Sequence, residues 1–338
     1  MYGLTEDFLD SLTIRDITFV YDGKLLEEDG KLWHEFVNEK DASYEYKEIS
    51  ENSFICCTNS RVEVSGKLFD VLLRNNINIV FVLGSKLYEY GVIHQGEKTI
   101  DYEKIRLEIS KQQASVVLRK RRRILQRAKF KDINLTSEDF RQYDIYHQDA
   151  IYKISLAQSQ QTINGQLGNM MKLYYQLFDK LFHEGMDWAG KRKESIGSSC
   201  LNFVERLLEN HVRIILLANG INEKISISRH SEKHRKGALI QDLKFEFSPI
   251  LIDLVCVKVF NQKVLGLSDF DKWVEGDELP EVVRNKLTLT FNKKLESELC
   301  YPGTKRKVSH SRMISIQALQ IYKISIGKLN FYNPIDTK

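Results

Sequence analysis

The spacing of hydrophobic and polar residues changes near residue 100. Before that point, apolar residues come in short runs at 17–21, 54–57, 62–64, 77–83 and 87–93. Asp22-Gly23 and Gly84 follow two of these runs and are typical turn residues. Residues 67–74 differ, because their apolar positions recur at helical spacing. The pattern predicts a β-rich domain with one helix.

From about residue 102 the apolar positions follow a helical period, as at Ile105, Ile109 and Val116. A second helical stretch covers residues 137–161, and Ser137, Glu138 and Asp139 give it a helix-start signal. Helices continue to about residue 326, with loops expected near 185–199, 231–237 and 266–280. We therefore predict an α+β chain, with an N-terminal β-domain at 1–100 and an all-α, catalytic-type C-terminal domain at 101–338.

Composition supports a folded protein inside a reducing compartment. The chain is 42% hydrophobic and 28% charged, which is enough apolar material for buried cores. Its five cysteines are odd in number and form no Cys-x-x-Cys pair, so neither a zinc ribbon nor a disulfide framework is indicated. Neither a signal-peptide pattern nor an apolar run of 18 residues is found. These features predict a cytoplasmic protein without a membrane span.

Positive charge is concentrated in one stretch of the predicted helical domain. The net charge of +4 permits a nucleic-acid partner without arguing for one. Residues 118–131, however, contain eight lysines or arginines and no acid. The five consecutive cations are Arg119, Lys120, Arg121, Arg122 and Arg123. Such a run favours contact with phosphates, and a solvated basic helix face explains it equally well.

A histidine and an aspartate are the strongest candidates for chemistry. His230 follows an alternating segment and precedes a polar loop, and Asp242 comes 12 residues later, at or near the start of a predicted helix. Together they suit Mg²⁺ or Mn²⁺, which prefer oxygen ligands and tolerate imidazole. Glu246 lies one turn after Asp242 and shares its helix face. The competing interpretation is that Asp242 caps the helix and that His230 has a structural role.

Several short segments occur in an order that resembles the CRISPR spacer-acquisition integrases, which are metal-dependent DNA nucleases and transesterases. They are a Gly-x-x-x-Tyr-x-x-Gly turn at 84–91, an aromatic-x-Gly-x-Arg element at 188–192, the helix end at 217–220, the Asp-Leu-x-x-Glu-Phe-x-Pro segment at 242–249, a Gln-Ala pair at 317–318 and a Tyr-x-Pro element at 332–334. The resemblance covers nearly the whole chain.

This resemblance implies that His230 and Asp242 are metal ligands and that a third catalytic ligand falls on Asn164. The family pattern expects a glutamate before a glycine, and here Asn164 precedes Gly165. A shift of the register by two residues would place Gln166 there, which is also uncharged. Because cation affinity rises with ligand charge, either residue should weaken binding of Mg²⁺ or Mn²⁺.

The resemblance further implies a homodimer formed through the β-domains and a complex with the small ferredoxin-like spacer-acquisition subunit. The double-stranded DNA partners would be a protospacer and the CRISPR repeat, joined through the protospacer 3′ ends. Besides the run from Arg119 to Arg123, the residues expected to contact phosphates are Lys191, Arg192, Lys233, His234 and Arg235. Two alternatives remain open: a catalytically silent DNA-binding member of the same complex, and an unrelated helical DNA-binding protein.

Overall fold

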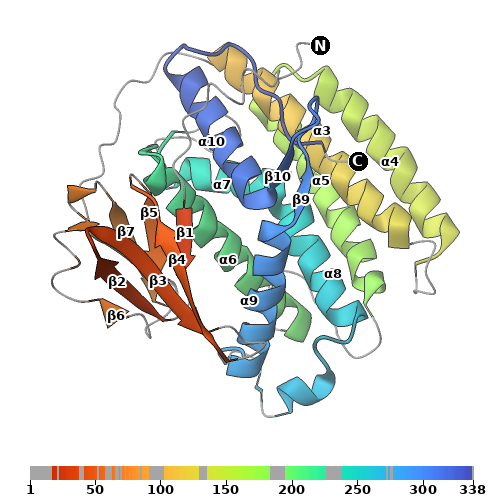
Figure 1. Ribbon diagram of the computed structural model, residues 1–338. Helices are drawn as coiled ribbons and strands as arrows, with labels where there is room; N and C mark the ends of the chain where they lie inside the picture. The colour runs from red at the N-terminus through yellow and green to blue at the C-terminus, as the bar shows by residue number, and fades with distance from the viewer. Residues whose placement is uncertain are drawn as a thin grey trace. The chain divides into compact units, whose positions relative to one another are not determined.

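The structure is a computed structural model of the 338-residue chain. It describes residues 17–20, 23–37, 42–51, 53–57, 63–64, 68, 71–72, 74–75, 77–83, 86–90, 103–128, 135–182, 195–225, 237–271, 273–274 and 277–336. The chain divides into a β unit, residues 12–97 with 214–222, and a helical unit made of 1–11, 98–213 and 223–338 (Figure 1). Strands precede a mostly helical part, which confirms the α+β prediction.

The first sheet of the β unit is built from the predicted apolar runs. It contains β1 (Ile17–Val20), β5 (Phe54–Cys57), β7 (Asn78–Leu83) and β8 (Lys86–Tyr90), in the order β1-β5-β7-β8. The first three strands are parallel, and β8 returns antiparallel to β7. All four residues of β5 are buried, as expected for a strand covered on both faces.

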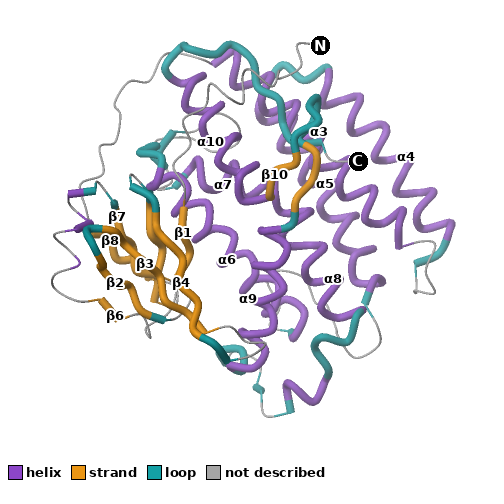
Figure 2. The backbone as a smooth tube through the Cα atoms, in the orientation of Figure 1, coloured by secondary structure: helices purple, strands orange, loops and turns teal. Residues whose placement is uncertain are grey.

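The second sheet was largely missed from the sequence. It consists of β4 (Tyr44–Ile49), β3 (Lys31–Val37), β2 (Lys24–Glu28) and β6 (Glu63–Val64), in the order β4-β3-β2-β6 (Figure 2). Asp29 and Gly30 connect β2 to β3 with positive φ angles of 53° and 77°, the conformation that a two-residue hairpin turn requires. Only Ile49 is buried in β4, so this strand has no apolar run to predict it.

Two buried clusters hold the β unit together. One includes Val20, Leu25, Leu32, Ile55 and Ile79, which come from both sheets. The other combines Phe54, Cys56 and Val80 with Ile214 and Ala218. The alternating side chains of β5 therefore enter different clusters, as the pleat of a strand dictates. The second cluster also explains why residues 214–222 group with the β unit, which a single boundary at residue 100 does not anticipate.

The helical unit contains α3 (Glu103–Ala128), α4 (Ser137–Ser155), α5 (Gln160–Phe178), most of α6 (Ile196–Ala218), α7 (Ala238–Ser248), α8 (Leu254–Asn261), α9 (Glu281–Glu296) and α10 (His310–Ser325). A π-helix, Pro249–Asp253, joins α7 to α8. An unpredicted hairpin, β9 (Glu298–Cys300) with β10 (Lys307–Ser309), precedes α10. Of the helices that the structure describes, none has the length and apolar character needed to cross a membrane.

Side-chain caps explain where α4 and α5 begin. The stretch predicted at 137–161 is two helices, because Thr136 starts α4 in a capping box with Asp139, and Ser159 starts α5 by accepting from the Thr162 N–H. Each cap satisfies an amide that the first helical turn leaves without a partner. Because α5 begins at Gln160, Asn164 lies within this helix.

Candidate functional site

Asn164 lies on the solvent-exposed face of α5. Its Oδ1 accepts a hydrogen bond from Gln160 Nε2, one turn earlier on the same helix, at 3.1 Å. Since Ser159 is the N-cap of α5, Asn164 does not cap this helix. The amide that was expected to reach a metal ion is thus exposed and has a local partner.

Asp242 is fully buried, in the second turn of α7. The helix begins after Gly237, which makes no side-chain capping bond, so the interpretation of Asp242 as an N-cap is wrong. His230 lies outside the described residues. The convergence of Asn164, His230 and Asp242 therefore stays a prediction.

The buried face of α5 carries a residue that the sequence interpretation overlooked. It consists of Ile163, Leu167, Met170, Tyr174 and Phe178. Leu167 is followed by Gly168, so α5 holds a second residue–glycine pair three positions after Asn164-Gly165. Leu167 is 1% exposed. It is therefore the position of this turn whose side chain is directed into the interior of the helical unit. None of the 19 residues of α5 is an aspartate or glutamate.

Glu246, the other acid on α7, is the centre of a buried hydrogen-bond network. Its Oε1 accepts from Gln317 Nε2 at 2.8 Å and from the Ile335 N–H at 2.9 Å. Its Oε2 accepts from Gln113 Nε2 at 3.0 Å and from the Tyr332 hydroxyl. Four donors thus occupy the two oxygens, and Glu246 is not free to serve as a metal ligand.

This network joins three of the segments on which the family resemblance rests. Glu246 comes from the Asp-Leu-x-x-Glu-Phe-x-Pro segment, Gln317 from the Gln-Ala pair and Tyr332 from the Tyr-x-Pro element. Gln317 Nε2 also donates to the Asn333 carbonyl at 2.9 Å, which holds the segment after α10 against that helix. The three segments therefore share a packing role, and chemistry is not needed to explain why they occur together.

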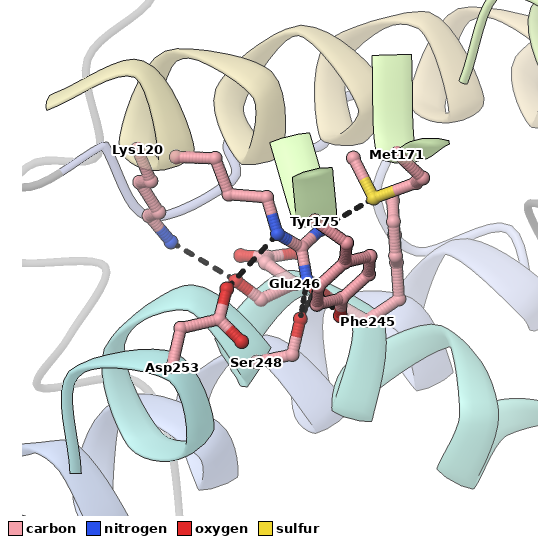
Figure 3. Close-up of polar contacts among 8 residues, drawn as sticks. Lys120, Met171, Tyr175, Phe245, Glu246, Ser248 and Asp253 are labelled. Atoms are coloured by element: carbon pink, nitrogen blue, oxygen red, sulfur yellow. Dashed lines mark hydrogen bonds and ion pairs between the residues drawn. The ribbon is translucent and has the colours of Figure 1, made fainter. Parts of the chain in front are cut away.

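Arg121 is the centre of a second buried cluster, and its partners Met171, Tyr175, Ser248 and Asp253 are labelled in Figure 3. Its Nε donates to Asp253 Oδ2 at 3.0 Å, and its Nη atoms reach Ser248 Oγ at 3.0 Å and Met171 Sδ at 3.0 Å. The guanidinium also lies 5.7 Å from the ring centre of Tyr175. Burial opposes the positive charge, but the attraction of Asp253, Tyr175 and Tyr174 together with the hydrogen bond to Asp253 outweighs it, which holds the pKa of Arg121 above its usual value.

The cations beside Arg121 also have partners within the helical unit. Lys120 is 4% exposed and donates to the Glu246 carbonyl at 3.1 Å (Figure 3). Burial lowers the pKa of Lys120 to about 8. Arg122 pairs with Asp144.

Arg119 and Arg123 both pair with Asp336, at 3.0 and 2.7 Å. Most of the charge in the run from Arg119 to Arg123 is thus directed toward acids of the same chain. Lys120 and Arg121 in addition have no surface from which to reach a phosphate. The other predicted contacts, Lys191, Arg192, Lys233, His234 and Arg235, lie outside the described residues.

The described residues do not by themselves fit a Mg²⁺ or Mn²⁺ site. Over the part of the chain that the structure describes, no group of three or more histidine, cysteine, aspartate or glutamate side chains is placed to hold a metal ion. Asp242 is a suitable carboxylate, but Glu246 is engaged by donors and Asn164 is exposed. A complete ligand set would need His230 and a further oxygen ligand.

Comparison with known proteins identifies the family. Residues 22–293 match the family model described as CRISPR associated protein Cas1. This match covers most of the chain, so the protein belongs to the Cas1 family of CRISPR-associated endonucleases and integrases, which act in the acquisition step of antiviral defence. The family is generally metal-dependent.

Individual relatives are distant. The chain is 26% identical over 170 residues to CRISPR-associated protein Cas1 1 of Methanobrevibacter ruminantium, covering 49% of this chain and 52% of the relative. It is 22% identical over 189 residues to CRISPR-associated endonuclease Cas1 3 of Thermus thermophilus, covering 55% and 57%. The chain thus spans about half the length of these curated relatives.

The fold is also found in solved structures. A chain of a partial Cas6-RT-Cas1–Cas2 complex superimposes with a TM-score of 0.71 at 15% identity, over 96% of this chain and all of the other.

Proposed function

We propose that this chain binds protospacer duplexes in a CRISPR adaptation complex and that its metal-dependent joining of their 3′ ends to the repeat is impaired. Membership of the Cas1 family supports the DNA substrate and the reaction class. By the same resemblance, the chain would form a homodimer through its β unit and associate with the small ferredoxin-like subunit. Mg²⁺ or Mn²⁺ would be held by His230 and Asp242.

One observation carries the proposed impairment: α5 offers no carboxylate in any of its 19 residues. A divalent ion at such a site stabilises the charge that develops on a phosphodiester and activates the attacking group. Its affinity depends on ligand charge. Whichever position of α5 faces the ion, that position carries no negative charge, so the metal should bind weakly and strand transfer should be slow.

Burial favours Leu167 over Asn164 as the position that faces the ion. Asp242 is buried, so an ion bound to it would lie inside the helical unit, toward which α5 directs Leu167. Asn164 and the half-buried Gln166 instead lie along the outward part of the same turn. A leucine supplies no ligand at all, whereas an asparagine would supply a neutral oxygen.

A catalytically silent DNA-binding member of the complex is the second candidate. The missing carboxylate favours it as well, since an inactive chain can still hold duplex DNA for an active partner. The two candidates differ in the strand transfer that remains when Mn²⁺ is abundant.

The test is an integration assay with the chain, its small partner subunit, a labelled protospacer duplex and a supercoiled plasmid carrying the repeat, in Mn²⁺. We expect duplex binding but slow joining by the unmodified chain. Leu167→Glu should raise the joining rate by roughly tenfold or more, which corresponds to about 1.4 kcal/mol of transition-state stabilisation. Asp242→Ala in the Leu167→Glu background should abolish the gain.

Matched variants separate the ligand effect from added charge. Asn164→Glu tests the alternative register, and Asn169→Glu places the same charge on the exposed face of α5. Leu167→Gln has the shape of Leu167→Glu without the charge, and circular dichroism should confirm that each variant is folded. Efficient joining by the unmodified chain, with no response to any of the glutamate substitutions, would overturn the proposed impairment.

A further inference from the structure

The hairpin formed by β9 and β10 presents three consecutive cations at the surface of the helical unit. Its strands, β9 and β10, are labelled side by side in Figure 1 and pair antiparallel. The register places Lys307 opposite Cys300. The connection turns at Gly303, whose φ of 83° is readily adopted only by glycine. Lys305, Arg306 and Lys307 follow the turn and are exposed. Basic character is therefore concentrated at the end of a short two-stranded ribbon.

Hydrogen bonds fix the conformation of this ribbon. The Tyr301 N–H donates to the Arg306 carbonyl at 2.8 Å, and the Thr304 N–H donates to the Tyr301 carbonyl at 3.0 Å. The Tyr301 side chain is 1% exposed, and its hydroxyl accepts from Gln320 Nε2 of α10 at 3.1 Å. The turn is thus anchored on a buried helix, and little backbone freedom would be lost when its cations meet a ligand.

The ribbon contrasts with the longer basic run on α3. There Lys120 and Arg121 are buried, and Arg119 and Arg123 share the carboxylate of Asp336. In the hairpin all three cations are exposed. Phosphate binding requires cations that can approach the nucleic acid and release its counterions, and a two-stranded ribbon has the dimensions to enter a duplex groove.

We propose that the β9–β10 hairpin is a duplex-DNA contact, with Lys305, Arg306 and Lys307 binding backbone phosphates. This inference rests on the proposed function, because it takes duplex DNA as the ligand. Among the described residues, the hairpin cations take the role that the sequence predicted for Lys120 and Arg121, which are buried. The hairpin adds affinity without base specificity, since phosphate contacts position a protein on DNA but do not read its sequence.

The salt dependence of duplex binding tests the hairpin. In the intact chain, log Kobs should fall linearly with log salt concentration. Changing Lys305, Arg306 and Lys307 together to Gln should reduce the magnitude of that slope by about 2 to 3, because each phosphate contact contributes roughly 0.9. The control variant changes Arg141, Lys263 and Lys328 to Gln, which removes three exposed cations elsewhere in the helical unit. It should leave the slope nearly unchanged.

Cys300 provides a second measurement on the unmodified chain. It is the one exposed cysteine, the other four being buried, and it lies opposite Lys307. Saturating duplex should slow its alkylation by iodoacetamide at least several-fold. An unchanged salt slope in the hairpin variant, or unchanged alkylation while the duplex is bound, would overturn the hairpin contact. Failure of the intact chain to bind duplex at all would instead overturn the proposed function.

Discussion

Arg121 and Glu246, two of the buried charged groups of the helical unit, are compensated in different ways. Arg121 on α3 has a formally charged partner, Asp253, at 3.0 Å. The Glu246 carboxylate on α7 is surrounded by two amides, a hydroxyl and a backbone N–H. Both side chains are at most 3% exposed. The first is therefore a buried ion pair within a polar and aromatic shell, and the second is a buried anion held by neutral donors.

This difference determines what each cluster contributes. A buried ion pair regains little more than the solvation that both charges lose, so apolar residues of similar volume can replace the pair at small cost. A carboxylate held by four donors is tied to each of those donors and to the segments that carry them. Around Glu246 these segments are α3, α10 and the chain after α10. We therefore expect that apolar residues can replace Arg121 and Asp253 together at small cost. In the Glu246 network, we expect that only conservative substitutions, which keep most of its hydrogen bonds, are tolerated.

The largest expected effect is that of Arg121→Met. It removes the cation and leaves the Asp253 carboxylate buried without its charge partner, which should lower the free energy of unfolding by about 3 to 5 kcal/mol. Urea denaturation followed by circular dichroism at the helical band measures this change. The double variant Arg121→Met, Asp253→Leu should recover most of the loss. A double variant as unstable as the single one would show that Asp253 is not the reason for the cost.

Glu246→Gln should have a smaller effect, a loss of about 1 to 3 kcal/mol in the free energy of unfolding. The new amide places an NH₂ group among donors, but two neighbours can adapt: the Tyr332 hydroxyl can rotate, and the side-chain oxygen of Gln113 has no hydrogen-bond partner among the described residues. Glu108→Gln is the control, because Glu108 is exposed and pairs with Lys111 at 2.8 Å, outside the network. The same denaturation measurement checks both, and equal losses in the two variants would contradict the role of the network.

The sequence was sufficient to predict those strands and helices whose own hydrophobic pattern reflects their burial. The apolar strands of the first sheet and the long helix α3 were predicted, because their hydrophobic period matches their burial. The second sheet was missed because strands such as β4 are exposed and charged. The helix break before α5 was also missed, since apolar spacing continues across it while the Ser159 cap starts a new helix.

The candidate site shows the limit more clearly, because it depends on residues that are distant along the chain. The run from Arg119 to Arg123 was open to interpretation as a phosphate-binding surface, since nothing near it in sequence is acidic. Its acids, Asp144, Asp253 and Asp336, lie 22 to 217 positions away. Similarly, Asn164 precedes a glycine as the family pattern requires, but only the structure shows that Leu167 occupies the buried face. The sequence identified residue types suited to binding phosphate or a metal ion. The fold determines which of these residues are placed to do so.

At neutral pH the smallest expected loss concerns Lys120, which follows Arg119 and precedes Arg121 on α3 and whose Nζ donates to the Glu246 backbone carbonyl. Burial lowers the pKa of Lys120 to about 8, from an ordinary value of 10.5. Between these values the unfolded chain binds more protons than the folded chain, so the contribution of Lys120 to stability should rise with pH. From pH 7 to 9.5, the free energy of unfolding should rise by about 2 kcal/mol relative to the Lys120→Met variant. At pH 7 the variant should be at least as stable as the unmodified chain, because it avoids burying a charge. Parallel stability curves across this range would mean that Lys120 keeps its ordinary pKa and that its burial is fully compensated by its surroundings.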